Sequence, residues 1–293
     1  MPSKIEWTDE TINPVVGCTK CSPGCQYCYA ERMARRLQAM GLEQYQDVVD
    51  PDGYWTGEIG LNLTVLDKLK HWKKPRRVFM VSMGDLFHEN VPFPVISEIA
   101  VAMMNAPQHT FQLLTKRPER MLEWFVWSGF SNKTLPNVWV GVTAENQEQA
   151  DKRIPVLLKI PAAVRFVSIE PMLSKIDLDR PTWLLGKATD ANPTRLDWVI
   201  VGGETGPGAR PMDLQWARDI RDQCNAAGVP FFYKGAGTAN HSKSKYGYRL
   251  LDGREWNEFP SSSAPKFNKS PSVPKFYGIG WDDQNESREL DAD

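Results

Sequence analysis

The sequence predicts an α/β fold, a partial (β/α) barrel of about six parallel strands with a cysteine loop after the first strand. Three observations support this prediction. Short apolar runs alternate with amphipathic stretches, the apolar residues within a run are consecutive, and a polar or glycine-bearing loop follows each run. Strands that are apolar on consecutive positions are buried on both faces, as parallel strands covered by helices are. Their alternation with helices implies repeated right-handed βαβ units.

The expected strands are the apolar runs of this pattern. They lie at 77–83, 110–115, 137–143, 164–170, 197–203 and 229–234, and the stretch TINPVVG at 11–17 is a possible first strand before the cysteines. Six or seven strands fit a closed or partly closed barrel. An open doubly wound sheet is the alternative, because the number of strands alone does not decide between the two architectures.

Helices are expected between these strands, near 94–105, 118–127, 145–159 and 213–227. Another helix should follow the cysteines, because Ala30, Met33, Ala34 and Leu37 recur at three- and four-residue spacing and form one apolar stripe. Residues 41–77 are less regular and are interpreted as an insertion in a single domain spanning 1–259. Residues 260–293 are rich in serine and proline and end acidic, without periodicity, so we expect a mobile tail.

The composition is that of a soluble globular protein, with 41% hydrophobic and 24% charged residues among 293. A formal net charge of -1 argues against wholesale coating of nucleic acid or of an anionic membrane. The first residues are polar, without the core of a signal peptide, and no apolar run reaches membrane-spanning length. We therefore expect a cytoplasmic protein without a membrane partner.

Polar residues follow the expected strands, at the positions that both architectures bring to one edge of the sheet. The loops are SMGDLFHE, TKRPER, TAEN, SIEP and GGETGPGARP. A charged or hydroxyl group after each apolar run indicates the lining of a polar pocket. Plainer explanations exist for single members: Asp85 or Glu145 would also serve as helix caps, and the glycines between 202 and 208 do not match the dinucleotide fingerprint.

Four of the five cysteines, Cys18, Cys21, Cys25 and Cys28, lie within eleven residues. In a reducing compartment such a cluster indicates metal binding or redox chemistry rather than disulfides. A zinc site normally uses two short-spaced pairs that are separated by a dozen or more residues. Only three residues separate Cys21 from Cys25. An iron-sulfur cluster is larger and can be held by one loop, particularly when three of its irons need protein ligands.

The spacing Cys21-x3-Cys25-x2-Cys28, with Tyr27 before the last cysteine, resembles the signature of the radical S-adenosylmethionine (SAM) superfamily. In that superfamily three thiolates hold a four-iron four-sulfur (4Fe-4S) cluster, and the fourth iron binds SAM. The resemblance implies a radical SAM enzyme with a 4Fe-4S cluster and SAM as cofactors, and with a reductant protein as partner. A zinc site remains the alternative.

Longer blocks are similar to a phage- and prophage-associated family of radical SAM-like proteins of unknown function. The similarity runs from about residue 4 to about residue 235 and includes IEWTDETINPVVGCT, SPGCQYCYAERMARR, FQLLTKRPERM and WVIVGGETGPGARPM. This resemblance implies the cytoplasm of a bacterial host. The family usually has cysteines at the positions of Cys18, Cys25 and Cys28, with an aliphatic residue at the position of Cys21. The third ligand is therefore Cys18 or Cys21, and we favour Cys18 because the family resemblance covers more residues.

By analogy with the superfamily, residues of the polar loops are assigned to parts of SAM. Tyr27 would lie near the adenine, and the loop with Ser82, Gly84 and Asp85 would bind the amino group. Lys116 or Arg117 would pair with the carboxylate. The ribose hydroxyls are assigned to Thr143, Glu145 or Glu170, and the backbone at Gly202 and Gly203 would border the adenine.

The substrate is not identified by these patterns. Tyr29, Arg32, Arg35 and Arg36, together with KHWKKPRR at 70–77, are a candidate surface for nucleic acid, where cations contact phosphates and aromatic rings stack on bases. A solvated helix face and loop is the simpler explanation. A second function also stays open, a non-catalytic zinc or iron-sulfur module that binds nucleic acid or a phage protein.

Overall fold

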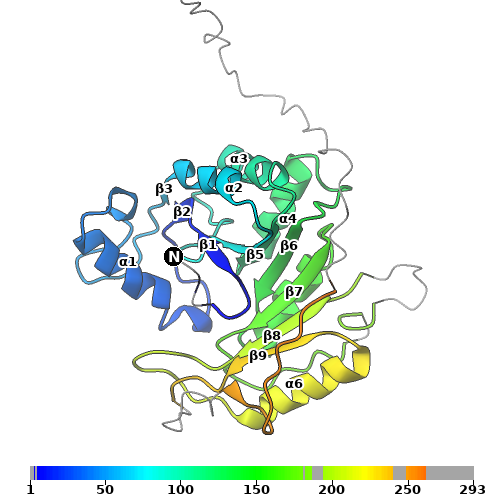
Figure 1. Cartoon of the computed structure of the whole chain (residues 1–293). Coiled ribbons are helices and arrows are strands. Elements are labelled where there is room, and N and C mark those ends of the chain that lie inside the picture. The colour runs from blue at the N-terminus through cyan, green and yellow to red at the C-terminus, as the bar shows by residue number, and fades with distance from the viewer. Residues whose placement is uncertain (1–2, 4, 181, 187–193, 240–248, 262–293) are drawn as a thin grey trace, which may run out of the picture.

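A curled sheet of parallel strands forms the centre of the molecule (Figure 1). The computed structural model describes residues 3, 5–180, 182–186, 194–239 and 249–261. The sheet strands in this part are β1 (Glu10–Ile12), β4 (Arg77–Met80), β5 (Thr110–Thr115), β6 (Val138–Thr143), β7 (Val164–Ile169), β8 (Trp198–Gly202) and β9 (Phe231–Gly235). They form a seven-stranded sheet in the order β1-β4-β5-β6-β7-β8-β9, and every neighbouring pair is parallel. The partial barrel is confirmed, and the doubly wound alternative is wrong because the strand order never reverses.

The expected first strand is divided in two. β1 ends at Ile12, and after Asn13 and Pro14 the short strand β2 (Val15–Val16) pairs antiparallel with β3 (Gly60–Leu61). Pro14 has no N–H to donate to a ladder. The Asn13 side-chain oxygen instead accepts hydrogen bonds from the backbone of the loop after β4, at distances of 2.6 and 3.1 Å from the nitrogens of Ser82 and Met83. The break therefore ties the start of the cysteine loop to the end of β4.

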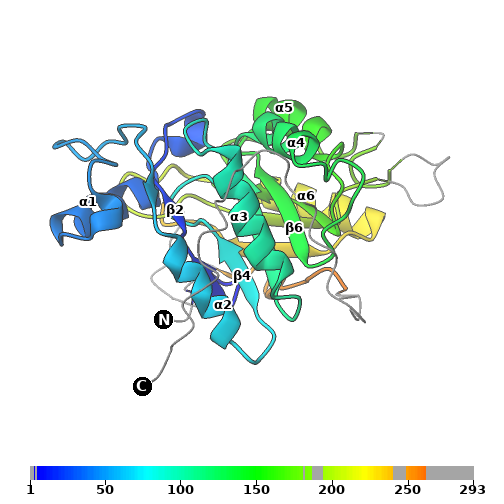
Figure 2. The ribbon, with the colours of Figure 1, turned by 90° about the horizontal axis from the view of Figure 1, so that it is seen from above.

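The longer helices follow the predicted pattern. They are α1 (Tyr29–Ala39), α3 (Phe93–Met104), α4 (Pro118–Trp127), α5 (Gln147–Leu157) and α6 (Leu214–Ala227). β5 and α4 have the predicted bounds, and the other predicted strands and helices after residue 77 begin and end within about three residues of their predicted bounds. Figure 2 shows α1 at one side of the molecule and α6 at the other. None of the helices in the described ranges is both long and apolar enough to cross a bilayer.

Residues 41–77, expected to form an irregular insertion, contain short elements in addition to β3. These are the 3-10 helices η2 (Glu43–Tyr45) and η3 (Leu63–Asp67) and the helix α2 (Lys68–His71). Leu66 of η3 and Leu69 of α2 pack in the main core, whereas Tyr45 of η2 packs in a smaller cluster with Ala30 and Ala34 of α1. The tail expected at 260–293 lies outside the described residues from 262 onward.

Both faces of the sheet carry buried apolar side chains, which belong to two separate clusters. The outer face packs against the helices in one large core, which joins Met80 and Val140 to Ile96, Phe125 and Ile220. The inner face carries a second cluster, made of Trp7, Phe79, Trp139, Val164, Phe166, Trp198, Ile200 and Phe232. These aromatic rings fill the barrel toward the amino ends of the strands, so the open space lies toward the carboxyl ends.

Candidate metal centre and cofactor cavity

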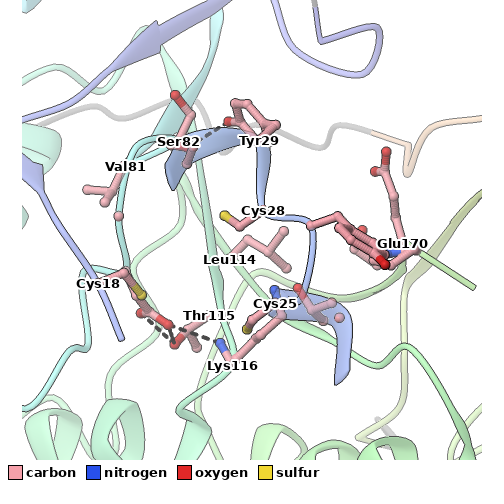
Figure 3. A pocket seen from close by; sticks show the side chains of 18 of the residues that line it. Cys18, Cys25, Cys28, Tyr29, Val81, Ser82, Leu114, Thr115, Lys116 and Glu170 are labelled. Atoms are coloured by element: carbon pink, nitrogen blue, oxygen red, sulfur yellow. Dashed lines mark hydrogen bonds between the residues drawn. The ribbon is translucent and has the colours of Figure 1, made fainter. Parts of the chain in front are cut away.

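A cavity of about 500 Å³ opens at the carboxyl ends of the strands, and all four clustered cysteines line it. Figure 3 shows three of them, Cys18, Cys25 and Cys28. This volume is in the usual range for organic ligands. Most of the predicted SAM-binding residues line it as well: Tyr27, Ser82, Gly84, Asp85, Lys116, Arg117, Thr143, Glu170 and Gly203. Glu145 and Gly202 do not line this cavity; Glu145 is fully buried, and Gly202 ends β8 beside it.

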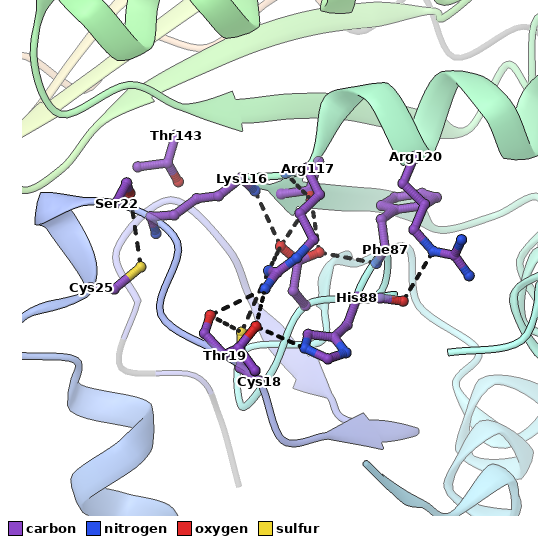
Figure 4. Close-up of polar contacts among 12 residues, drawn as sticks. Cys18, Thr19, Ser22, Cys25, Phe87, His88, Lys116, Arg117, Arg120 and Thr143 are labelled. Carbon is purple, nitrogen blue, oxygen red and sulfur yellow. Dashed lines mark hydrogen bonds and ion pairs between the residues drawn. The ribbon is translucent and has the colours of Figure 1, made fainter. Parts of the chain in front are cut away.

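The first end of the cysteine loop is held by Arg117, which follows β5 (Figure 4). Its Nη1 donates to Cys18 Sγ at 3.7 Å and to Asp85 Oδ2 at 3.2 Å. Its Nη2 donates to Thr19 Oγ1 at 2.7 Å and to the Thr19 carbonyl oxygen at 3.1 Å. One guanidinium group therefore joins the loop after β2 to the loop after β4.

The Asp85 carboxylate is occupied by protein donors. Besides Arg117, it accepts hydrogen bonds from Thr115 Oγ1 at 2.7 Å, Phe87 N at 3.0 Å and Lys116 N at 3.2 Å. Asp85 is 5% exposed. In this arrangement Asp85 orients the residues that follow β5, and its neighbour Gly84 is the member of the loop that meets the cysteine loop, through a parallel bridge to Gly17.

His88 also contacts the first end of the cysteine loop, at Thr19. Its Nε2 lies 3.0 Å from Thr19 Oγ1, and Asn90 N donates to its Nδ1 at 3.2 Å. Because Nδ1 accepts, Nε2 carries the proton of the neutral ring. Burial lowers the pKa of His88, and the nearby Arg117 lowers it further. The neutral imidazole is therefore the form that this site stabilises.

The middle of the cysteine loop rests on Glu145, which follows β6. Gly24 N donates to Glu145 Oε1 at 2.9 Å, and Arg153 Nη1 donates to Oε2 at 2.9 Å. A Cβ atom built at Gly24 would lie 3.0 Å from Glu145 Cδ, so the loop backbone lies directly on the carboxylate. Burial raises the pKa of Glu145, but a hydrogen bond from Ser22 and the charge of Arg153 outweigh it and leave the pKa below its usual value.

The second half of the cysteine loop, from Pro23 onward, is held by Arg210, in the loop between β8 and α6. Arg210 pairs with Glu204 of the same loop and donates to the Pro23 carbonyl at 3.1 Å and to Gln26 Oε1 at 3.2 Å. Its guanidinium lies 5.4 Å from the centre of the Tyr27 ring. The pair of Glu204 and Arg210 was not predicted from the sequence. The signal that could have indicated it is Glu204, an acid that directly follows the two glycines at the end of β8.

The electrostatics of the loop differ from one thiol to the next. A hydrogen bond from Cys21 holds the pKa of Cys25 well below its usual range, and the charge of Lys116 adds to the effect. Burial raises the pKa of Cys18 to about 12, with a contribution from Asp85. Burial would lower the pKa of Lys116, yet the neighbouring Cys25 and Glu145 raise it. Cysteine binds metals as the thiolate, and a neighbouring lysine stabilises that form.

The donor set therefore fits a cluster that is anchored by thiolates. Four thiols of one loop face one cavity, and the cations of Lys116 and Arg117 lie beside them to balance negative charge. Within the described ranges, no group of three or more His, Cys, Asp and Glu side chains is placed so that it could hold a single metal ion.

A family model of proteins of unknown function, DUF5131, matches residues 2–260. The chain belongs to this family. Its description names no reaction. A search of curated proteins gave no match. Among solved structures, a spore photoproduct lyase complexed with dinucleoside spore photoproduct is similar at 11% sequence identity with a TM-score of 0.35. The alignment covers 72% of this chain and 59% of the lyase chain, so this chain spans less than two thirds of that length.

The DUF5131 chain has a second charged pair on the opposite wall of the cavity. Lys234 Nζ on β9 donates to Glu170 Oε1 at 2.5 Å, and both residues line the cavity with Ser168 of β7. Glu170 was a predicted binding residue, whereas Lys234 was not, because it lies inside the apolar run VPFFYKG. The inward orientation of Lys234, toward the cavity, is visible only in the folded, curved sheet.

The two basic runs that we considered as one nucleic-acid surface lie apart. Arg76 and Arg77 pair with Glu10 and Asp9 at the amino end of β4. Tyr29 lines the cavity at the carboxyl ends of the strands, and Arg32 follows it on α1. Arg76 and Arg77 thus lie at the amino end of β4 and Tyr29 at the carboxyl ends of the strands, and a nucleic-acid surface that joins the two runs stays a prediction.

Proposed function

We propose that this chain is a radical SAM enzyme that holds a 4Fe-4S cluster on the cysteine loop and SAM in the adjoining cavity. One observation supports this most strongly. All four clustered cysteines line a single cavity at the carboxyl ends of a parallel half-barrel, beside cations that can face an anionic ligand. Parallel barrels place their reactive groups at this end.

Cys18, Cys25 and Cys28 are the proposed cluster ligands. Cys18 is partly buried and its sulfur accepts a hydrogen bond from Arg117, whereas Cys21 is exposed. A more buried side chain holds a metal group more precisely than an exposed one. Cys21 is the alternative third ligand.

When bound, the cluster and SAM supply a one-electron reductive cleavage that gives methionine and a 5'-deoxyadenosyl radical able to abstract hydrogen. A reductant protein is the expected partner. The chain's own residues bind and orient SAM. The Lys116 ammonium donates no hydrogen bond to a side chain or carbonyl within the described ranges and pairs with the SAM carboxylate. Asp85 fixes Lys116 through the backbone N–H of that residue.

The remaining contacts to SAM follow from the walls of the cavity. Tyr27, set between Arg210 and Gly208, borders the adenine, as does the backbone at Gly203. Thr143 presents a hydroxyl to the ribose. Ser82 and Gly84 supply the backbone groups for the SAM amino group. Glu145 seats the cysteine loop instead of contacting the ligand, because its carboxylate is taken up by Gly24 and Arg153.

The test is anaerobic reconstitution of the full chain with iron and sulfide, followed by iron counting and electron paramagnetic resonance of the reduced protein. The proposal predicts about four irons per chain and a spectrum that changes when SAM is added. A Cys25→Ala variant should lose the signal, and Cys224→Ala, which changes the buried cysteine of α6, should keep it. Stoichiometric zinc without a cluster would contradict the proposal and favour the non-catalytic metal module.

A further inference from the structure

We propose that the wall formed by β7 and β9 is the substrate side of the cavity and binds the base of a nucleotide, with the nucleotide phosphate beside Arg32 at the mouth. This inference rests on the proposed function, because it names the substrate class of the same site.

The cavity has two chemically distinct walls. The cysteines, Asp85, Lys116 and Arg117 come from the loops after β2, β4 and β5. Glu170 directly follows β7 and Lys234 lies on β9, on the other side of β6 in the sheet order. Figure 3 shows Cys18 and Glu170 on opposite sides of the cavity. Apart from the backbone at Gly203, which is assigned to the adenine, the wall that carries no thiol holds no proposed SAM contact and is the side left to a second molecule.

The ion pair on this wall crosses over β8, which lies between its two partners. Gly202 leaves room for this crossing, because a Cβ atom built there would lie in tight contact with Lys234 Cβ, at 3.2 Å, and in ordinary contact with Glu170 Cγ, at 3.6 Å. Lys234 binds Glu170 Oε1, and Glu170 Oε2 accepts no hydrogen bond from the described residues. The Glu170 side chain is 23% exposed. A half-buried carboxylate with an open oxygen accepts N–H groups, such as those on the edge of a base.

The floor beneath the pair is aromatic. Trp7, Phe79 and Leu114 line the cavity, and Trp7 and Phe79 are 2% and 7% exposed. The buried Trp7 indole nitrogen has no hydrogen-bond partner among the described residues. Flat rings stack on bases of any sequence.

The mouth carries an exposed arginine on the same side. Arg32 of α1 donates to the Pro207 carbonyl at 3.4 Å, across to the loop whose residues Gly203, Glu204 and Thr205 line the cavity. A second cavity of about 190 Å³ continues from this wall and shares Glu170, Lys234 and Thr205 with the first. The Glu170 carboxylate on the inner wall matches the N–H groups on the edge of a base, and the aromatic floor matches the flat face of that base. Arg32 at the mouth matches the phosphate of the nucleotide.

The experiment measures equilibrium binding of nucleoside monophosphates and of short single-stranded DNA and RNA to the full, cluster-loaded chain with SAM. We expect saturable binding that Glu170→Gln weakens about tenfold or more, because the amide lacks the charge of the acceptor. Arg32→Met should weaken binding and reduce its dependence on salt. Arg35→Met, a matched charge change on the α1 face that contacts Gly53 instead of the mouth, should bind like the wild type.

Because Glu170→Gln leaves Lys234 without its carboxylate, the double variant Glu170→Gln, Lys234→Gln is measured beside it and should bind equally weakly. Mononucleotides that bind as tightly as strands identify a free nucleotide as the ligand, and binding of strands alone identifies a polynucleotide. Both results support the inference.

The inference is overturned if cluster-loaded protein that cleaves SAM binds none of these probes, or binds them equally in wild type and Glu170→Gln. The proposed function would stand in either case. Conversely, Glu170-dependent nucleotide binding by protein that cleaves no SAM would support the base site and contradict the proposed function.

Discussion

The backbone N–H of Gly24 donates to the buried carboxylate of Glu145, 2.9 Å away and 121 residues later in the chain. Arg117 holds the first part of the same loop and Arg210 holds its second half, so each of the three anchors follows a different strand, β5, β6 or β8. The positions of the cysteines are thus set by the barrel and not by the loop alone.

Glu145→Gln should destabilise the fold and loosen the cysteine loop. The substitution leaves the Arg153 guanidinium, 3% exposed at its side chain, buried without a counter-charge. Removal of one partner of a buried ion pair costs about 3–5 kcal/mol of unfolding free energy, which urea denaturation measures. Glu148→Gln, an exposed change on α5, the helix that carries Arg153, is the control. Equal stability of both variants would contradict the role given to Glu145.

The third cluster ligand is decided by alanine variants of two cysteines. Cys18→Ala should lose most of the bound iron after reconstitution, because the Arg117-held thiol is removed. Cys21→Ala should keep it, because Cys21 is the exposed member of the set. Iron and sulfide analysis of both proteins measures the difference. The reverse pattern would assign the ligand to Cys21 and restore the x3-x2 spacing.

Lys116→Met should weaken SAM binding to the cluster-loaded protein about tenfold or more, because a charge-assisted contact to the carboxylate is lost. Asp85→Ala should also weaken it, indirectly, since the Asp85 carboxylate accepts from Lys116 N and Arg117 Nη1. Lys152→Met, exposed on α5, is the matched control. Isothermal titration under anaerobic conditions gives the affinities. If neither variant differs from the control, the assigned SAM contacts are wrong.

The stability of the cluster-free protein should fall as the pH is lowered from about 7.5 to 5.5. Burial and Arg117 lower the pKa of His88 in the folded state, whereas an unfolded histidine titrates near about 6.5. Between the two pKa values the unfolded chain binds a proton at His88 that the folded chain does not bind. The stabilisation from neutral His88 is therefore complete above about pH 6.5 and is lost as the pH falls toward the lower pKa of the folded state.

The pH dependence is measured as the unfolding free energy at several pH values for the wild type and for His88→Gln. The lowered pKa of Cys25 gives a slope of the same sign, so the contribution of His88 is the difference between the two proteins. His88→Gln should show the flatter profile. A wild type that becomes more stable on acidification would contradict the assignment.

Much of the fold was predictable because parallel strands covered on both faces appear in the sequence as continuous apolar runs. TFQLLT at 110–115 is an example, and its strand has the predicted bounds. The first strand was not predictable in detail, because the break at Asn13 depends on a hydrogen bond to a loop seventy residues later. The gathering of the cysteines with Asp85, Lys116 and Thr143 in one cavity agrees with their positions after strands.

The inner wall of the barrel was harder to predict. In VPFFYK, Phe232 and Lys234 point inward while Phe231 and Tyr233 face the helices, so a two-residue alternation is hidden by apolar residues on both faces. For the same reason Trp7, which precedes the first strand, was not expected on the floor of the cavity. Three-dimensional curvature, which the sequence pattern does not record, decides both cases.

The most direct test of the central claim is 5'-deoxyadenosine formation by the reconstituted full chain under reducing, anaerobic conditions with SAM, measured by liquid chromatography and mass spectrometry. The account predicts deoxyadenosine in the wild type and its loss in Cys25→Ala and Cys28→Ala, with Cys224→Ala like the wild type. A fully loaded cluster that forms no deoxyadenosine, or equal amounts in wild type and Cys25→Ala, would contradict it.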